Sequence, residues 1–275
     1  MKIGIFFNKK RKSETEKPAR DIYDWLKSNG HSPYLNPHKE TMLRTLNFAV
    51  AIGGDGTVLG LANTVARFRI PLVGINFGHK GWLCAISGDE IKKKLGIILQ
   101  KDLKNKKAID RRTRVKAKVS NNGKKIIQID GLNEIVIGGI PKTVSLEVEI
   151  IDGYDKYFVW IIGDGIIITT KTGSTAYWKN ARGPPFTVDA LGILANNAIF
   201  EDPKGIILSD IYNPLPQNTE AIVSSRNVVY KIRILNEYKD NLPYLIADGQ
   251  RVHRLHKGDK IEIKRSRNKN LFIRV

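Results

Sequence analysis

A glycine-rich loop with an aspartate at its centre is the part of the sequence best suited to chemistry. The apolar run Phe48 to Ile52 leads into Gly53-Gly54-Asp55-Gly56-Thr57, and a helical pattern follows. Glycines let a backbone approach a ligand closely, and the amides at a helix start attract anions. A carboxylate there could hold magnesium through water or accept a proton from an attacking hydroxyl. A tight turn with a capping aspartate is the alternative, and these residues alone do not decide between the two.

A hydroxyl-rich turn, residues 171–177, follows Gly163-Asp164-Gly165 and a second apolar strand. The hydroxyls of Thr172, Ser174 and Thr175 suit ribose or phosphate oxygens, and Tyr177 could stack on a base. Taken by itself, the turn is more typical of a helix cap with Tyr177 in the core.

Two shorter motifs carry acidic and amide groups. Asn133 and Glu134 lie side by side just before an apolar strand, where an amide and a carboxylate could hold both hydroxyls of a ribose. Asp248-Gly249-Gln250 is typical of a turn when considered alone. Neither motif identifies a function without the others.

The charge balance leaves several classes of anionic ligand open. The chain has 275 residues, with 46 Lys and Arg against 27 Asp and Glu, and a formal net charge of +19. This excess should attract nucleic acid or nucleotide phosphates. However, the basic stretches Lys92 to Lys118 and Lys264 to Lys269 lack the interleaved aromatic residues of an RNA-stacking surface. We therefore favour a solvated basic surface over specific nucleic-acid binding.

Cysteine and histidine usage limits the covalent and metal chemistry. The single Cys84 excludes an internal disulfide and a multi-cysteine zinc site, and we expect it in the core. The five histidines show no metal-ligand spacing, so we predict no metal centre built from side chains alone. The first residues lack the order of a signal peptide, and no apolar stretch reaches roughly 18 residues. We expect a cytoplasmic protein without a membrane span.

Strands alternate with helices in the first part of the chain, which predicts βαβ units and a parallel sheet. The expected elements are the strand Lys2 to Asn8, the helix Lys17 to Asn29, the strand Phe48 to Ile52, the helix Val58 to Phe68 and the strand Pro71 to Ile75.

The character changes to mainly β after about Lys107. Asn121-Asn122-Gly123 separates two strand-like runs and predicts a hairpin turn. The expected strand segments are Thr113 to Ser120, Lys125 to Ile129, Val144 to Ile151, Val159 to Thr170 and Val228 to Leu235.

Taken together and in this order, the four motifs resemble the NAD kinase family. The resemblance extends from Lys2 to about Ile263, and it includes Gly74 to Leu83, which looks like a glycine-rich stretch of that family. The glycine–aspartate loop alone is shared with phosphofructokinases and with diacylglycerol and sphingosine kinases. The conjunction of this loop with Asn133-Glu134 and the turn at Gly173 to Tyr177 is specific.

The resemblance implies a fold with two domains. Residues 1–107 would form a Rossmann-like α/β domain that binds the phosphate donor, with residues 266–275 packing back on it. Residues 108–265 would form a β-sandwich-like domain that binds NAD. The implied activity is transfer of a phosphoryl group from ATP or polyphosphate to the ribose 2′-hydroxyl of NAD, with Mg²⁺ or another divalent cation as cofactor. A homodimer or homotetramer is also implied.

The resemblance also assigns roles to residues. Asp55 would act on the ribose hydroxyl, Asp164 would meet the nicotinamide end of NAD, and Asp248 would close the site. The remaining expected contacts with the donor or NAD are Gly54, Gly56, Thr57, Asn133, Glu134, Lys171, Thr172, Ser174, Thr175, Ala176, Tyr177 and Asn180.

Several positions depart from the family's pattern. Lys171 stands where the family has proline, which places a cation near the expected phosphates, and Trp82 replaces phenylalanine. The segments Trp178 to Pro185, which contains Asn180, and Ser209 to Leu215 match the family poorly. Alternatives to an NAD kinase are another kinase with this loop, acting on a lipid or a sugar phosphate, or a non-catalytic nucleotide- or RNA-binding protein.

Overall fold

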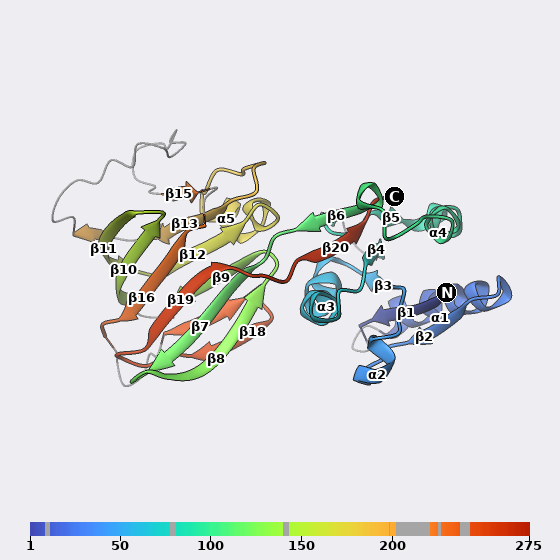
Figure 1. Cartoon of the computed structure of the whole chain (residues 1–275), viewed down its shortest axis with the longest axis horizontal. Helices are drawn as coiled ribbons and strands as arrows, with labels where there is room; N and C mark the ends of the chain where they lie inside the picture. Colours follow the sequence, from blue (N-terminus) through green and yellow to red (C-terminus); the bar gives the residue numbers. More distant parts are fainter. Residues whose placement is uncertain are drawn as a thin grey trace. The chain divides into compact units, whose positions relative to one another are not determined.

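The structure is a computed structural model that describes residues 1–8, 12–77, 81–139, 143–197, 199–201, 221–224, 227–236 and 243–275. It contains both helices and strands, with most elements being strands, and the predicted mixed α/β composition is confirmed. The chain forms two compact units (Figure 1). Unit 1 comprises Met1–Arg112 with Asn268–Val275, and unit 2 comprises Thr113–Arg267.

A largely parallel sheet forms the centre of unit 1, with the strand order β2-β1-β3-β4-β20-β6 and with β5 paired to β4. β1 pairs in parallel with β2 and β3, and β3 pairs in parallel with β4, so the predicted parallel pairing is confirmed. The strands are β1 (Lys2–Phe7), β2 (Ser32–Leu35), β3 (Phe48–Gly53), β4 (Leu72–Asn76), β5 (Ile86–Ser87), β6 (Ile109–Arg112) and β20 (Asn270–Ile273).

Helices α1 (Lys12–Ser28), α2 (Glu40–Leu43), α3 (Asp55–Phe68) and α4 (Ile91–Leu99) connect these strands. Two helices begin earlier than the sequence predicts. Pro18 lies inside α1, although proline usually marks a first helical turn, and this displaced the expected start. α3 begins at Asp55, because the extended backbone of Gly54 caps it. The loop aspartate is therefore the first residue of the helix.

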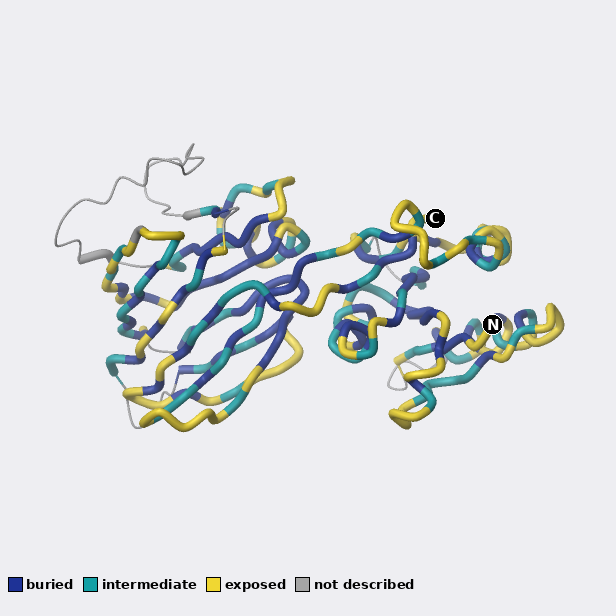
Figure 2. The backbone as a smooth tube through the Cα atoms, in the orientation of Figure 1, coloured by how far each residue is buried: buried dark blue, intermediate teal, exposed yellow. Residues whose placement is uncertain are grey.

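The apolar core of unit 1 joins the strands to α1 and α4. Figure 2 shows β3 as a continuously buried strand, as expected for a strand covered on both sides. Burying each large aliphatic side chain contributes about 1.5–3 kcal/mol, so this cluster fixes where β3 ends and the glycine loop begins. Its fully buried members include Ile3, Ile5, Phe48, Val50, Ile52, Leu26, Leu95 and Ile98.

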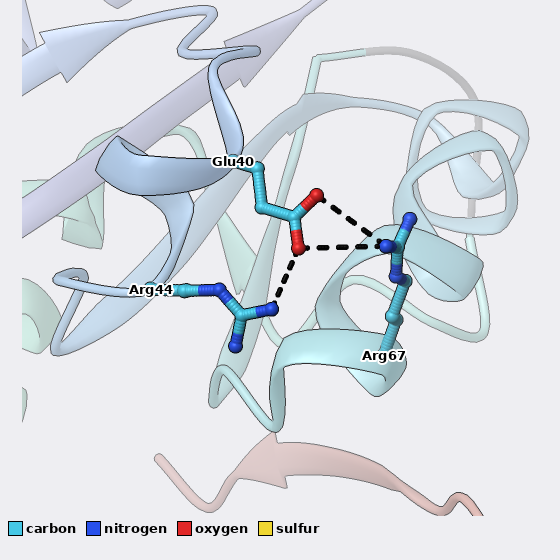
Figure 3. A network of polar contacts seen from close by, with 3 residues as sticks. All are labelled: Glu40, Arg44 and Arg67. Atoms are coloured by element: carbon cyan, nitrogen blue, oxygen red, sulfur yellow. Dashed lines mark hydrogen bonds and ion pairs between the residues drawn. The ribbon is translucent and has the colours of Figure 1, made fainter.

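An ion-pair network on the surface of unit 1 links α2 to α3 (Figure 3). Glu40 accepts from Arg44 at 2.6 Å and from Arg67 at 3.4 Å. All three side chains are largely exposed, so each pair contributes at most about 1 kcal/mol. The buried contacts, rather than this network, position α3.

Unit 2 consists of two antiparallel sheets that share one apolar core. The first has the order β14-β11-β10-β16-β19-β7-β8, and the second has the order β15-β13-β12-β9-β17-β18. The strands of the first sheet are β7 (Val115–Asn121), β8 (Lys124–Gly131), β10 (Val144–Asp152), β11 (Asp155–Gly163), β14 (Ile199–Glu201), β16 (Val229–Ile234) and β19 (Lys260–Arg265). Those of the second are β9 (Glu134–Gly138), β12 (Gly165–Thr170), β13 (Leu191–Asn196), β15 (Ala221–Ser224), β17 (Tyr244–Ala247) and β18 (Arg251–Arg254).

Two expectations for unit 2 are settled by the backbone. The hairpin at Asn122-Gly123 is confirmed, because both residues have positive φ and β7 pairs antiparallel with β8. The expected continuous segment Val159 to Thr170 is wrong. Asp164 separates β11 from β12, which begins at Gly165 with a φ of +139°, and these strands belong to different sheets. The Gly163-Asp164-Gly165 motif interrupts the apolar run at this point, but it does not indicate that the next strand joins another sheet.

None of the helices in the described ranges combines the length and the hydrophobicity that a membrane span requires. The departure expected at Ser209 to Leu215 lies outside the described residues.

Candidate active site

The carboxylate of Asp55 is held by the backbone of a neighbouring loop. Its Oδ2 accepts from the amide of Trp82 and its Oδ1 accepts from the amide of Leu83, both at 2.9 Å. A Cβ at position 81 would lie 2.6 Å from Oδ1, so Gly81 permits this close approach. Asp55 remains partly exposed, and its carboxylate is therefore both oriented and accessible.

The positions of the glycines in this loop differ in whether the fold requires glycine. Gly53 has a φ of +145°, and a Cβ there would lie 2.4 Å from Oγ1 of Thr57. The fold therefore requires glycine at 53. At Gly54 and Gly56, an added Cβ would meet nothing within 4 Å, and neither has a positive φ. Space is therefore free above these two residues at the N-terminus of α3, where backbone amides favour an anion.

Cys84 lies beside this loop rather than in the core. Its side chain is partly buried, and its thiol contacts the carbonyl of Gly53 at 3.6 Å. Burial and, second, the Asp55 carboxylate raise the pKa of the Cys84 thiol to about 12. The prediction that Cys84 lies in the core is wrong, because its side chain is only partly buried beside the loop. The thiol stays protonated at neutral pH.

In unit 2, the carboxylate of Asp248 clamps the loop that carries Asn133 and Glu134. It accepts from the amides of Leu132 at 2.8 Å, Asn133 at 2.7 Å and Glu134 at 3.3 Å. Asp248 has a φ of +53°, a conformation that aspartate tolerates better than most residues. Burial raises the pKa of Asp248, and the three amide hydrogen bonds oppose this rise. The sequence placed Asp248 against a ligand, but its hydrogen bonds shape the protein loop.

Asn133 and Glu134 are buried, with only 7% and 6% of their surfaces exposed. Among the described residues, Oδ1 of Asn133 and Oε2 of Glu134 are buried without a hydrogen-bond partner. Such atoms are rare in folded proteins, because an unsatisfied buried polar group costs about 1–3 kcal/mol. Burial and, second, Asp248 raise the pKa of Glu134 to about 8. Both side chains are therefore poised for partners that the protein itself does not supply.

The hydroxyl-rich turn is fastened to the same loop. The amide of Thr170 donates to the carbonyl of Asn133 at 2.8 Å, and Oγ1 of Thr170 donates to the carbonyl of Leu132 at 2.6 Å. A Cβ at Gly173 would lie 2.2 Å from the carbonyl oxygen of Asn133. The structure therefore brings the turn and the loop together, and glycine at 173 makes this contact possible.

The side chains of the turn divide into structural and available groups. Ser174 is buried, and its hydroxyl donates to the carbonyl of Lys171 at 2.9 Å while accepting from the amide of Phe186 at 3.2 Å. Its hydrogen bonds hold the turn, and the ligand contact expected for Ser174 stays a prediction. The others are partly or fully exposed, namely Lys171, Thr172, Thr175, Ala176, Tyr177 and Asn180.

The structure buries Trp178 rather than Tyr177, whereas the helix-cap interpretation of the turn places Tyr177 in the core. Tyr177 is 43% exposed, so its placement in the core is wrong. Trp178 is fully buried instead, and its ring packs edge-on to Phe186 with centroids 6.0 Å apart. A Cβ at Gly183 would lie 2.4 Å from the indole of Trp178. The segment that departs from the family's pattern thus forms a local core under the turn.

A pocket of about 610 Å³ in unit 2 collects several predicted residues. Glu134, Asp164 and Tyr177 all line it. The side-chain amide of Asn197 donates to Oδ2 of Asp164 at 2.8 Å and holds Asp164 there. Gly165 and Gly249 come from the Asp164 and Asp248 motifs. The remaining lining is mostly glycine and apolar side chains that the sequence did not single out, namely Val136, Gly138, Gly139, Ile166, Ile167, Asn196, Tyr244 and Ile246.

A buried charged group that the sequence reasoning missed lies beside the clamp. Arg114 is only 1% exposed, and its guanidinium donates to the carbonyl of Asp130 at 3.3 Å. Ser266 donates to the Asp130 carboxylate at 2.7 Å. Burial lowers the pKa of Arg114, while Asp130 and Asp248 oppose this effect. Nothing in the local pattern of β7 signals that an arginine is buried there.

Known proteins of one kind match this chain. A family model described as the ATP-NAD kinase N-terminal domain matches residues 38–103. An NAD kinase of Ruminiclostridium cellulolyticum is 31% identical over 231 residues, covering 83% of this chain and 73% of the relative. An NAD kinase of Caldanaerobacter subterraneus subsp. tengcongensis is 29% identical over 290 residues, covering 100% of this chain and 94% of the relative.

Solved structures share the fold. An NAD kinase from Archaeoglobus fulgidus, in complex with ATP, matches with a TM-score of 0.68 and 21% identity, covering 100% of this chain and 94% of the other. Yeast NADH kinase complexed with NADH matches with a TM-score of 0.70 and 18% identity, covering 100% and 83%.

The loop geometry and these matches place the chain in the class of phosphotransferases. Within this class, the chain belongs to the NAD kinase family, because its sequence matches full relatives along most of their length. The family predicted from the sequence motifs is confirmed.

Proposed function

We propose that the protein transfers the terminal phosphoryl group of ATP, or of polyphosphate, to the 2′-hydroxyl of the adenosine ribose of NAD, forming NADP. Membership of the NAD kinase family confirms the predicted phosphorylation of NAD. The choice of donor and the roles of individual residues remain part of the proposal. The observation that carries it is the pair of buried, unpartnered oxygens on Asn133 and Glu134.

Asp55 is the proposed proton acceptor. As the ribose oxygen forms its bond to the terminal phosphorus, the hydroxyl proton passes to the Asp55 carboxylate. The bond between that phosphorus and the leaving oxygen breaks, which releases ADP or a shortened phosphate chain. The amides of Trp82 and Leu83 support this role, because they fix both carboxylate oxygens in position.

The donor phosphates are proposed to lie over Gly54 and Gly56, along Thr57. The free space above both glycines supports this, since internal packing does not account for glycine there. The first amides of α3 would face the phosphate oxygens. Lys171 is a further proposed contact, as an exposed cation at the start of the hydroxyl turn.

On the acceptor side, Asn133 and Glu134 are proposed to bind the ribose hydroxyls of NAD. A Glu134 carboxyl that keeps its proton near neutral pH can donate as well as accept, which suits a hydroxyl partner. Asp164 and Tyr177 support binding of NAD in the same pocket, which both line. Thr172, Thr175, Ala176 and Asn180 remain proposed contacts of the adjoining turn.

A divalent cation, Mg²⁺ by preference, is the proposed cofactor. Within the described ranges, no cluster of three or more His, Cys, Asp or Glu side chains forms a cage for a metal. Magnesium usually keeps several waters and uses one or two carboxylates plus substrate phosphates, so Asp55 would hold the ion through a bound water while staying available to the hydroxyl proton. Bound there, the ion would neutralise charge on the transferred phosphoryl group.

The two compact units are proposed to act as the donor-binding α/β domain and the NAD-binding β-rich domain, with Rossmann-like and β-sandwich-like architecture respectively. The α3 start supports the first assignment and the pocket with Glu134 supports the second. Cytoplasmic location and a homodimer or homotetramer are proposed on the resemblance to the family.

The test is a coupled assay of purified protein with NAD and Mg²⁺ that compares ATP with polyphosphate and measures NADP. We expect NADP to form, and Glu134→Gln to raise the KM for NAD. Glu149→Gln is the matched control, because Glu149 lies on the outward face of β10 and pairs with Lys231. Absence of NADP, with phosphorylation of a lipid or a sugar phosphate instead, would favour the alternative kinase. RNA affinity with steep salt dependence and no NADP would favour the non-catalytic alternative.

A further inference from the structure

A basic groove of about 450 Å³ on unit 2 has no role in the proposed reaction. Five cations line it together with neutral residues, and none of its lining residues in the described chain is an aspartate or glutamate. The cations are Lys116, Lys118, Lys264, Arg265 and Arg267, and the neutral residues are Gln128, Asn227, Val228 and Val229. We call this set the basic groove.

The basic groove lies on a different face from the NAD pocket. Along β7, Lys116 and Lys118 alternate with Val115, Ala117 and Val119, which face the shared core, so the lysines point outward from the first sheet. In the second sheet, Val136 lines the NAD pocket and alternates with core residues Ile135 and Ile137. The basic groove and the NAD pocket therefore open on the outer faces of two different sheets.

Like charges meet inside the basic groove. Lys116 lies directly opposite Lys264 in the register of β7 and β19, an arrangement that destabilises a sheet. Two carboxylates border the basic groove, since Asp130 lies opposite Lys116 and Glu262 lies opposite Lys118, and Glu262 also pairs with Lys264. Three lysines of the basic groove therefore share two carboxylates, so positive charge remains in excess.

The basic groove is also partly preorganised. Arg265 pairs with Asp189 at 3.2 Å, which fixes its guanidinium at one end. Val228 is 1% exposed and provides a rigid apolar floor. Fixed cations around a concave surface concentrate the field on an anion that enters it.

We propose that the basic groove binds a chain of phosphate groups, as in an inorganic oligophosphate or the triphosphate of a nucleotide, at a second site apart from the reaction. Several adjacent phosphates would match the spacing of successive cations, and charge-assisted hydrogen bonds to lysine and arginine are among the strongest that proteins make. The proposal does not depend on which donor the reaction uses.

The test is calorimetric titration of the full chain with tripolyphosphate, and separately with ATP, at low salt. Lys116→Gln with Lys118→Gln should weaken tripolyphosphate binding at one set of sites by about tenfold or more, as expected for losing two close charges. Lys124→Gln with Lys125→Gln is the matched control. It removes the same charge from the same hairpin at exposed residues outside the basic groove, and affinity should stay within about twofold.

The outcomes separate the proposal from its alternatives. Equal loss in both double variants, unchanged affinity in the first, or no binding by the unmodified protein would overturn it. So would RNA affinity that depends on Lys116 and Lys118 without tripolyphosphate binding. Loss of both ligands identifies the phosphate chain as the recognised group, and loss of tripolyphosphate alone identifies the inorganic chain. NADP formation is assayed in parallel, so failure of the proposed reaction is seen independently.

Discussion

Asp55 in unit 1 and Asp248 in unit 2 make the same kind of interaction in opposite environments. Each carboxylate accepts hydrogen bonds from backbone amides of a separate loop. Asp55 is partly exposed beside a loop with free space above its glycines. Asp248 is buried, and burial raises its pKa.

The difference in exposure suits Asp55 to a role in the reaction and Asp248 to a structural role. A proton acceptor must be reached by its substrate, and fixed orientation then helps the reaction. A buried carboxylate with three amide donors has its acceptor positions occupied, and its main effect is to hold those amides in place. The two aspartates should therefore respond differently to the same substitution.

The sharpest test of the comparison is Asp55→Asn. The amide oxygen can still accept one loop amide, so the fold and NAD affinity should change little. Loss of the proton acceptor should lower kcat by about a hundredfold or more. Steady-state NADP assays and an NAD titration measure the two effects, and near-normal kcat would remove Asp55 from its proposed role.

Asp248→Asn should act mainly on stability. The asparagine NH₂ group would face buried amide donors, leaving at least one of them unsatisfied at a cost of about 1–3 kcal/mol in unfolding free energy. The KM for NAD should rise as the loop with Asn133 loosens. Asp102→Asn is the control, because that exposed aspartate also accepts a backbone amide, from Lys104. Denaturant unfolding that shows equal stability for both variants would contradict the structural role.

Two alanine substitutions sharpen the reading of the Asp55 loop. Gly53→Ala should destabilise the protein by about 1–3 kcal/mol, because its φ is +145° and the new Cβ would clash with Thr57. Gly54→Ala should leave stability within about 0.5 kcal/mol, since nothing lies near the new Cβ. It should instead raise the KM for the phosphate donor. Thermal unfolding and donor kinetics compare the pair, and a destabilised Gly54→Ala with normal donor kinetics would count against a phosphate there.

A further test of the acceptor loop concerns the pH dependence of stability. The pKa of Glu134 is raised from 4.5 to about 8, so the folded protein binds this proton more tightly than the unfolded chain. Its contribution is fully present below about pH 4.5 and is lost as pH rises through about 8. Glu134→Gln should flatten that decline in denaturant titrations between pH 5 and pH 8. Parallel curves for the two proteins would show that Glu134 ionises normally.

Much of the fold could be predicted from sequence because periodicity reports burial. The fully buried β3 and the alternating pattern of β7 are visible in the residue order. The start of α3 was less visible, since a glycine cap gives no apolar signal. The change of sheet at Asp164 was hidden, because the Gly163-Asp164-Gly165 break between β11 and β12 does not indicate which sheet the next strand joins.

The candidate site could be predicted only as separate motifs. The loop at Asp55 and the pair Asn133-Glu134 stand out by residue type. The clamp by Asp248 depends on contacts between residues more than a hundred positions apart, which no local pattern encodes. Likewise, Trp178 rather than Tyr177 occupies the core, because close glycines make room for the larger ring.

The last strand of the sheet in unit 1 is synthesised long after the other strands of that sheet. β20 pairs with β4 and β6, and Asn270 donates to the carbonyl of Ala62 in α3 at 2.8 Å. A ribosome must therefore translate all of unit 2 before the strand that completes unit 1 emerges. Unit 2 is continuous in sequence and can form first on the nascent chain, while the sheet of unit 1 still lacks β20. A chain stopped at Arg267 would contain every residue that lines the pocket with Glu134, but it would lack β20 of the sheet in unit 1.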